Sequence, residues 1–374
     1  MSGKNVPVLR FPGFEGEWIP TNLDNLCSMQ AGKFIAASKI TDDCADNLFP
    51  CFGGNGVRGF VPKKTHAGRF PLIGRQGALC GNVQLASGEF YATEHALVVS
   101  AKNNAAVDWL YHLLRRLNLN QYATGQAQPG LSVEVLKRVE TSRPRSLEEQ
   151  GKIAAFLGAA DEKISGLEKK RALLTDYKRG VTQKLFSQEL RFKDDQGDDF
   201  PDWEEKRVSD VFKVTRGKVL AVPKMTREPE GASVFPVYSS QTRANGLTGY
   251  FTNFLYENAI TWTTDGANAG DVQYRSGKFY CTNVCGVLLS ENGYANKCVA
   301  EMLNRVTENY VSYVGNPKLM NNVMGEIRLR FPHPSEQKKI ADFLSAIDTQ
   351  ITLAADEIAA AKSFKKGLLQ QMFV

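Results

Sequence analysis

The sequence predicts an α+β protein with two tandem β-rich domains and two long helices that form an antiparallel coiled coil, arranged as a pseudo-twofold internal repeat. Three observations support this fold. Residues 149–186 align without a gap with residues 336–373, at a constant offset of 187 and with fifteen identities. Both segments have a helical period, and a similar β-rich segment precedes each. Because the offset is half of the 374 residues, a repeat of this length indicates a tandem duplication.

The two copies of the repeat predict helices over residues 146–187 and 334–374. Apolar residues recur in alternating steps of four and three, which is the 3.5-residue period of a coiled-coil seam. Ser146 and Glu149 have the spacing of a capping box at the start of the first helix. Polar residues interrupt the seam at Arg171, Lys178 and Lys365. The predicted seam residues are Ile153, Leu157, Ile164, Leu167, Leu174, Val181, Ile340, Leu344, Ile351, Ile358 and Leu368.

A seam this narrow needs a helical partner, and each copy is the best partner of the other. We expect the pair to be antiparallel if a pseudo-twofold axis relates the halves. At a rise of 1.5 Å per residue, forty residues make a rod of about 60 Å with one domain expected at each end. The alternative is that each helix packs only on its own domain.

The domains are predicted at residues 1–145 and 188–333. Residues 77–84 (GALCGNVQ) match 266–273 (GANAGDVQ), and residues 90–99 match 279–288, both at an offset of 189. Alternating apolar residues between Gly and Asp predict strands and hairpins, followed by a short helix at 108–118 and 297–307. The loops differ between the halves. A shared scaffold with divergent loops suits two domains that bind different targets.

Composition and motifs favour binding over catalysis. A chain with 43% apolar residues can bury two cores, and it shows no membrane-length apolar run and no signal-peptide core, so we expect a cytoplasmic protein. The seven cysteines form no CxxC pair and the four histidines show no ligand spacing, so neither a metal site nor a disulfide is predicted. Gly54-x-Gly56-x-x-Gly59 precedes Phe60-Val61-Pro62 in place of a helix, which indicates a turn. We therefore predict no catalytic residues and no cofactor.

Basic residues near aromatic residues and glycines are the strongest binding signal. Residues 1–145 carry 16 basic and 11 acidic side chains, whereas residues 188–333 carry 17 and 18, so any polyanion-binding face in the second half is a local cluster. Each basic residue near an aromatic residue or a glycine is, taken alone, typical of an ordinary solvated charge. Together these basic residues indicate contacts to phosphates and bases. The candidates are Arg58, Lys63, Lys64, Arg69, Arg75, Arg216, Lys218, Lys224, Arg227, Arg243 and Arg275.

The chain resembles the specificity subunits of type I restriction–modification systems over essentially its whole length. The motif E-Q-x-K-I-A-x-F-L occurs at 149–157 and 336–344, and each helix ends in K-x-G-x-x-Q-x-x-F at 178–186 and 365–373. Arg10-Phe11 before Trp18, and Arg191-Phe192 before Trp203, mark the two domain entries. The order of domain, helix, domain and helix is that of the family.

The resemblance implies a double-stranded-DNA-binding subunit that is not an enzyme alone. Each domain would read one half of a bipartite asymmetric site, and the helices would set the spacer and dock two modification subunits. S-adenosylmethionine, ATP and magnesium would belong to the methyltransferase and restriction subunits. Two alternatives remain: a specificity subunit for a fused methyltransferase–nuclease, and a coiled-coil scaffold whose β-rich domains bind no DNA.

Overall fold

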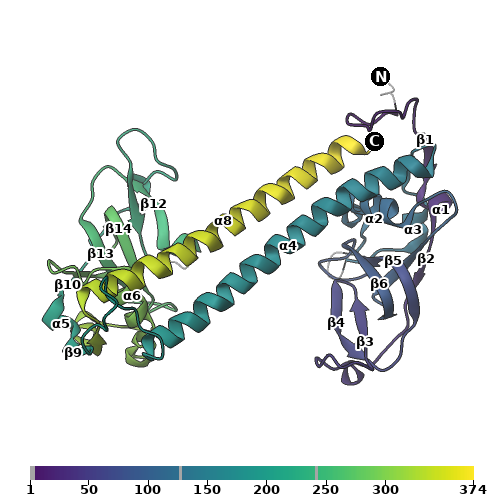
Figure 1. Cartoon of the computed structure of the whole chain (residues 1–374). Helices are drawn as coiled ribbons and strands as arrows, with labels where there is room; N and C mark the ends of the chain where they lie inside the picture. The colour runs from purple at the N-terminus through teal and green to yellow at the C-terminus, as the bar shows by residue number, and fades with distance from the viewer. Residues whose placement is uncertain (1–4, 126–128, 241–242) are drawn as a thin grey trace. The chain divides into compact units, whose positions relative to one another are not determined.

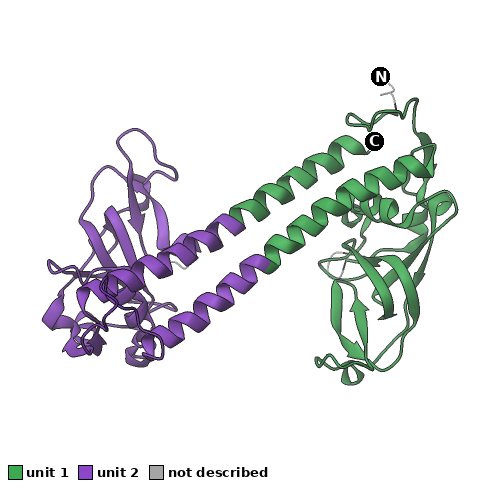
Figure 2. Ribbon diagram, in the orientation of Figure 1, with its two compact units in different colours: residues 1–169, 355–374 green, residues 170–354 purple. Residues whose placement is uncertain are grey.

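The computed structural model describes residues 5–125, 129–240 and 243–374. It contains two compact units, formed by residues 1–169 with 355–374 (unit 1) and by residues 170–354 (unit 2). The division runs through both long helices, α4 (Leu147–Phe186) and α8 (Pro334–Met372) (Figures 1 and 2). Residues 1–4 and 126–128 of the first predicted domain, and Gln241 and Thr242 of the second, lie outside the described residues.

Unit 1 is built on a six-stranded mixed sheet in the order β2-β7-β5-β6-β3-β4, in which only β3 and β6 pair in parallel. A separate two-stranded sheet pairs β1 with β8 near the start of α4. The elements of this unit are β1 (Ile19–Asn22), α1 (Leu23–Leu26), β2 (Cys27–Ala31), β3 (Phe49–Gly53), β4 (Gly56–Val61), β5 (His66–Gly74), β6 (Val83–Ala92), β7 (Ala96–Ala101), α2 (Val107–Arg116), α3 (Val133–Lys137) and β8 (Glu140–Arg143), with 3-10 turns at Ala37–Lys39 and Leu119–Tyr122.

Unit 2 repeats this topology strand for strand. Its sheet has the order β10-β15-β13-β14-β11-β12, again with one parallel pair, and β9 pairs with β16 as β1 does with β8. The predicted duplication is therefore confirmed at the level of the fold. The elements are β9 (Glu204–Arg207), α5 (Val208–Val211), β10 (Lys213–Arg216), β11 (Phe235–Tyr238), β12 (Leu247–Phe251), β13 (Tyr256–Thr263), β14 (Val272–Cys281), β15 (Cys285–Leu289), α6 (Lys297–Asn304), α7 (Asn321–Glu326) and β16 (Arg328–Phe331), with 3-10 turns at Val222–Lys224, Arg243–Gly246 and Thr307–Tyr310.

The long helices complete the cores of both units. In unit 1, Ile153 and Leu157 of α4 and Leu368 of α8 join the cluster around Trp18 and Trp109. In unit 2, Val181 and Leu185 of α4 pack with Ile340 and Leu344 of α8. Burying each such side chain contributes about 1.5–3 kcal/mol, which is an upper estimate because unfolded chains are partly compact.

Within each unit the two helices run antiparallel, as predicted. The first turns of α4 pack with the last turns of α8 in unit 1, and the last turns of α4 pack with the first turns of α8 in unit 2. All of the predicted seam residues are buried or half-buried. The seam is narrow because each helix also turns apolar residues toward its own domain.

Candidate nucleic-acid interface

Glu149 joins the N-terminal entry of unit 1 to the start of α4. Its side chain is only 2% exposed and accepts bonds from Arg10, at 2.8 Å from Nε to Oε1 and 3.0 Å from Nη2 to Oε2. Trp18 Nε1 donates to the same carboxylate at 3.2 Å. Half of the predicted capping box forms, because the Glu149 amide donates to Ser146 Oγ at 3.2 Å. The carboxylate does not complete the box because it binds the domain entry.

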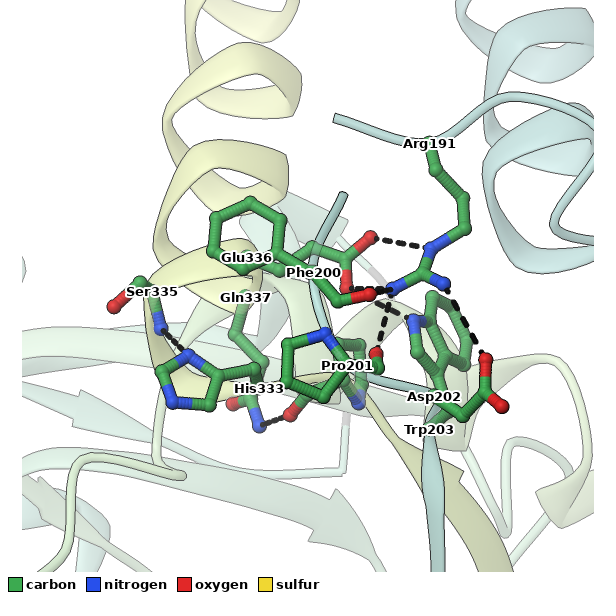
Figure 3. A network of polar contacts seen from close by, with 10 residues as sticks. Arg191, Phe200, Pro201, Asp202, Trp203, His333, Ser335, Glu336 and Gln337 are labelled. Atoms are coloured by element: carbon green, nitrogen blue, oxygen red, sulfur yellow. Dashed lines mark hydrogen bonds and ion pairs between the residues drawn. The ribbon is translucent and has the colours of Figure 1, made fainter. Parts of the chain in front are cut away.

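Glu336 repeats this arrangement in unit 2 (Figure 3). Arg191 donates from Nε to Oε1 at 3.1 Å and from Nη2 to Oε2 at 2.8 Å, and Trp203 Nε1 donates to Oε2 at 3.0 Å. The Glu336 side chain is 0% exposed. A buried carboxylate is tolerable only when it is paired and hydrogen-bonded, and a bidentate arginine also fixes orientation. Each pair therefore holds a domain in one position on its helix.

Glu149 and Glu336 are thus the anchors of the two domains. The glutamine that follows each of them binds the same domain a second time. Gln150 Oε1 accepts from the Ala106 amide at 2.7 Å, and its Nε2 donates to the Asn104 carbonyl at 3.0 Å. Gln337 Oε1 accepts from Asn296 Nδ2 at 2.8 Å, and its Nε2 donates to the Pro332 carbonyl at 2.8 Å. The repeated Glu-Gln dipeptides are therefore positioning residues.

Ion pairs cross between α4 and α8 at the polar positions of the seam. In unit 2, Lys178 Nζ lies 3.0 Å from Asp348 Oδ1 and 3.0 Å from Glu301 Oε1. Burial disfavours the Lys178 ammonium, but Glu301 and Asp348 outweigh it and raise the pKa of this lysine. Two carboxylates therefore keep the half-buried cation charged.

The equivalent lysine in unit 1 has a different setting. Lys365 pairs with Asp161, and Arg115 Nη1 also lies 3.6 Å from that carboxylate. Here burial dominates and lowers the pKa of Lys365. Within the aligned repeats, His112 takes the place of Glu301. This exchange removes one carboxylate from the site.

The predicted DNA-binding residues of unit 1 lie in three different settings. Arg58 on β4 lies beside Gln76, which follows Arg75 directly after β5, so both arginines lie near the same end of the sheet. Arg58 is exposed and Arg75 is half-buried. Lys63 and Lys64 lie in the connection from β4 to β5, where Lys64 pairs with Glu89. Arg69 on β5 binds Asp108, at 2.6 Å from Nε to Oδ1. The fold does not gather all five residues into one cluster.

In unit 2 most candidates are exposed on connections, and one is buried. Arg216, at the end of β10, places Nη2 4.0 Å from Asp265 Oδ2, and Arg243 begins the 3-10 turn before β12. Arg275 lies 3.9 Å over the Tyr238 ring and donates from Nε to Thr261 Oγ1 at 3.1 Å. Burial lowers the pKa of Arg275. The remaining candidates, Lys218, Lys224 and Arg227, are exposed.

A shallow hollow of about 410 Å³ lies beside Arg58 in unit 1. Four residues that the sequence reasoning did not select line it: Asn55, Gln76, Leu79 and His95. They were missed because candidates were chosen by positive charge, whereas base edges are also read by amides and apolar groups. The alignment of the two halves contains a signal for Gln76. Residues 77–84 match 266–273, but the two residues just before them differ between the halves.

The described part of the chain shows no group of three or more His, Cys, Asp or Glu side chains able to hold a metal ion. All seven cysteines are free, and six of them are buried while Cys44 is exposed. Among the described residues, no helix combines the length and apolar character needed to cross a membrane.

Comparison with known proteins agrees with the duplicated architecture. The family model of the type I restriction modification DNA specificity domain matches residues 15–175 and again residues 201–363. The chain belongs to this specificity family. Curated members include the specificity subunit of the Escherichia coli type I restriction enzyme EcoprrI, 48% identical over 155 residues, which cover 41% of this chain and 38% of that protein. The match thus spans under two-fifths of that relative.

Other members of the specificity family match over more of their length. A putative type I specificity subunit of Mycoplasma pneumoniae is 31% identical over 242 residues, which cover 64% of this chain and 93% of that protein. The crystal structure of the S subunit of a type I restriction–modification system from M. genitalium has a TM-score of 0.75 at 18% identity and covers 99% of both chains. This structural likeness shows the shared fold.

Proposed function

We propose that this chain is the sequence-specific DNA-binding subunit of a type I restriction–modification complex. Residues 1–145 and 188–333 act as target-recognition domains, each reading one half of a bipartite asymmetric site. Residues 146–187 and 334–374 act as the helices that set the spacer. The observation that carries the proposal is the repeated anchor: Glu149 and Glu336 hold two domains of one topology in the same way, while the exposed loops of those domains differ.

The proposed partners are two modification subunits, which methylate adenine with S-adenosylmethionine, and restriction subunits that use ATP and magnesium. The chain itself supplies no catalytic residue and works in the cytoplasm. Support for two docking sites comes from exposed aromatic residues at equivalent positions of the helices. Tyr177 of α4 is 55% exposed and Phe364 of α8 is 61% exposed, and 187 residues separate them. Aromatic residues are enriched at protein interfaces, so the repeat of an exposed aromatic at the same position of both helices fits two equivalent contacts.

Binding to DNA with the modification subunit bound tests the proposal. Each phosphate contact releases counterions, so affinity for a split site should fall steeply between about 50 and 200 mM salt. Arg58→Glu should weaken binding to one half-site, and Arg243→Glu should weaken binding to the other. A flat salt response would contradict a DNA function, and equal losses at both half-sites would contradict two separate reading domains. Either loss can be measured by fluorescence anisotropy with one half-site scrambled at a time.

A further inference from the structure

The two units share a hydrogen-bonded loop at one end of the sheet. In unit 1, the loop from Arg75 to Asn82 connects β5 and β6, and the Arg75 amide donates to the His95 carbonyl at 2.8 Å. In unit 2, the loop from Thr264 to Asp271 connects β13 and β14, and the Thr264 amide donates to the Val284 carbonyl at 3.0 Å. Both loops also bond to the segment after the next helices, through Gly77 to Pro129 and Gly266 to Pro317. The backbone scaffold is therefore the same.

Within this scaffold, both loops keep a glycine at the two positions where the backbone has a positive φ. Gly77 and Gly266 have φ of +88° and +102°, and Gly81 and Gly270 have φ of +85° and +91°, which only glycine adopts readily. The other side chains change at the same offset of 189. Arg75, Gln76, Leu79 and Asn82 in the first loop correspond to Thr264, Asp265, Asn268 and Asp271 in the second. A loop with a constant backbone and variable side chains presents different chemistry in one geometry.

The first loop opens onto the hollow beside Arg58. Gly54 and Gly77, which have no side chain, and Ala78, whose side chain is a methyl group, are part of its lining, so a ligand edge can approach the backbone. A Cβ on Gly54 would lie 3.2 Å from the His95 carbonyl oxygen. Leu79 is 56% exposed although it is apolar, and Gln76 is also exposed. The hollow thus offers an amide and an alkyl group to a planar partner.

Neighbouring side chains hold the polar groups of the hollow in place. His95 Nδ1 lies 3.0 Å from Gln76 Oε1, and Asn82 Nδ2 donates to Asn55 Oδ1 at 2.5 Å. A fixed amide pays less conformational entropy when it binds. In unit 2, the corresponding Asp265 Oδ2 accepts from Thr264 Oγ1 at 2.7 Å. Both loops therefore present an oriented group at the same backbone position.

We propose that residues 75–82 and 264–271 are the base-reading loops of the two domains, with Gln76 and Leu79 as specificity-determining residues in the first and Asp265 in the second. A glutamine amide pairs with the edge of adenine, and an alkyl side chain contacts the methyl group of thymine. An aspartate accepts from the amino group of cytosine. The first half-site therefore contains an A·T pair at the position facing Gln76, and the second contains a C·G pair at the position facing Asp265. His95 acts as a positioning residue for Gln76.

This inference rests on the proposed function, and methylome sequencing can separate the two. The complex of the full chain with its modification subunit is supplied to methylation-free DNA, and the methylated motif is read for the wild-type chain, Q76A, Q76D, L79A and D265N. Q76A should lose about tenfold to a hundredfold of its preference at one base pair of one half-site. D265N should alter one base pair of the other half-site. Q121A is the matched control, because Gln121 is an exposed glutamine of the same unit whose amide bonds to the Leu117 carbonyl, and its motif should be unchanged.

Three outcomes decide between the hypotheses. If the wild-type complex methylates a bipartite motif and Q76A, Q76D, L79A and D265N all leave it unchanged, the loops do not read bases and only the proposed function stands. If Q76A lowers methylation of every sequence equally while thermal unfolding is unaffected, Gln76 is no specificity residue and the inference is overturned. If the wild-type complex neither binds nor methylates a bipartite site, the proposed function fails as well. H95A should relax the same base pair as Q76A, and a change at a different pair would overturn its positioning role.

Discussion

Lys365 of α8 pairs with Asp161 of α4, and the same two positions of the repeat pair again with the helices exchanged, as Lys178 with Asp348. Each half of the chain therefore carries one acidic and one basic member of a reciprocal pair. A helix paired antiparallel with a second copy of itself would form both ion pairs. The seam is thus electrostatically self-complementary, as a twofold interface requires.

A half-chain of residues 1–187 should therefore dimerise at micromolar concentration. In the dimer, Asp161 of each copy would face Lys178 of the other. K178E should weaken the dimer by tenfold or more, because it places a second carboxylate opposite Asp161 of the other copy in a partly buried seam. The charge-swapped double variant D161K/K178D should recover dimerisation. Sedimentation equilibrium measures each constant.

The control for this experiment is R179E, because Arg179 is 79% exposed and pairs with Asp176 of its own helix. Its dimer should match the wild type within about twofold, as expected for an exposed pair. A monomeric wild-type half-chain would show that the two helices are not interchangeable.

The anchors should be sensitive to removal of a single charge. E149Q leaves Arg10 without its carboxylate, so we expect unit 1 to lose about 2–4 kcal/mol of stability. E148Q is the matched control one residue earlier, because the Glu148 side chain is 71% exposed and pairs only within the helix, with Lys152. It should change stability by less than about 0.5 kcal/mol. Urea unfolding followed by tryptophan fluorescence reports the difference, and similar losses in both variants would show that the anchor contributes little.

His112 should make the stability of unit 1 depend on pH. Its side chain is 2% exposed, and burial, reinforced by Lys365, lowers its pKa to about 4. Between pH 6.5 and about 4 the unfolded chain binds a proton that the folded chain does not, so stability falls as the pH falls. The full loss across this window is about 3 kcal/mol. Denaturant titrations at pH 7, 6 and 5 should show a steeper decline for the wild type than for H112Q, which has no ionisable group, and parallel declines would exclude His112 as the cause.

The exchange of His112 for its unit 2 counterpart gives a second test of the same site. H112E would supply Lys365 with the second carboxylate that Lys178 has in Glu301. We expect this variant to be at least as stable as the wild type at pH 7, whereas H112Q provides an uncharged comparison of similar size. An H112E chain that is less stable than H112Q would show that the site cannot hold a second carboxylate beside Asp161.

The proposed spacer role gives the length of the helices a measurable effect. Four residues inserted after Glu168 and after its repeat equivalent Ala355 lengthen both helices by about 6 Å and turn each downstream face by about 40°. The unspecified spacer should then grow by one or two base pairs, at about 3.4 Å per step. Both half-sites should keep their sequence, because no domain loop is touched. A changed half-site with an unchanged spacer in the methylome would mean that the helices do not set the spacing.

The sequence was sufficient for the features that local periodicity or the repeat carries. The 3.5-residue period located α4 and α8, and their antiparallel pairing followed on the condition that a pseudo-twofold axis relates the two halves of the repeat. The role of Glu149 could not be read locally, because its partner Arg10 is 139 residues away and only the fold brings them together. Lys178 and Lys365 appeared as interruptions of an apolar seam, although each has a carboxylate opposite it. Gln76 carries no charge, so a search for basic residues passed over it.

Phe373, which directly follows α8, ties the core of the first domain to a residue that is synthesised late. Phe373 lies 6.0 Å from the rings of both Trp18 and Trp109, so the core of the first domain includes a residue synthesised 355 positions after Trp18. At about 5–20 residues per second, the ribosome needs roughly 20–70 s to bridge that interval. Unit 2 uses only residues 170–354 and is complete earlier. The domain that is translated first is therefore the last to complete its core.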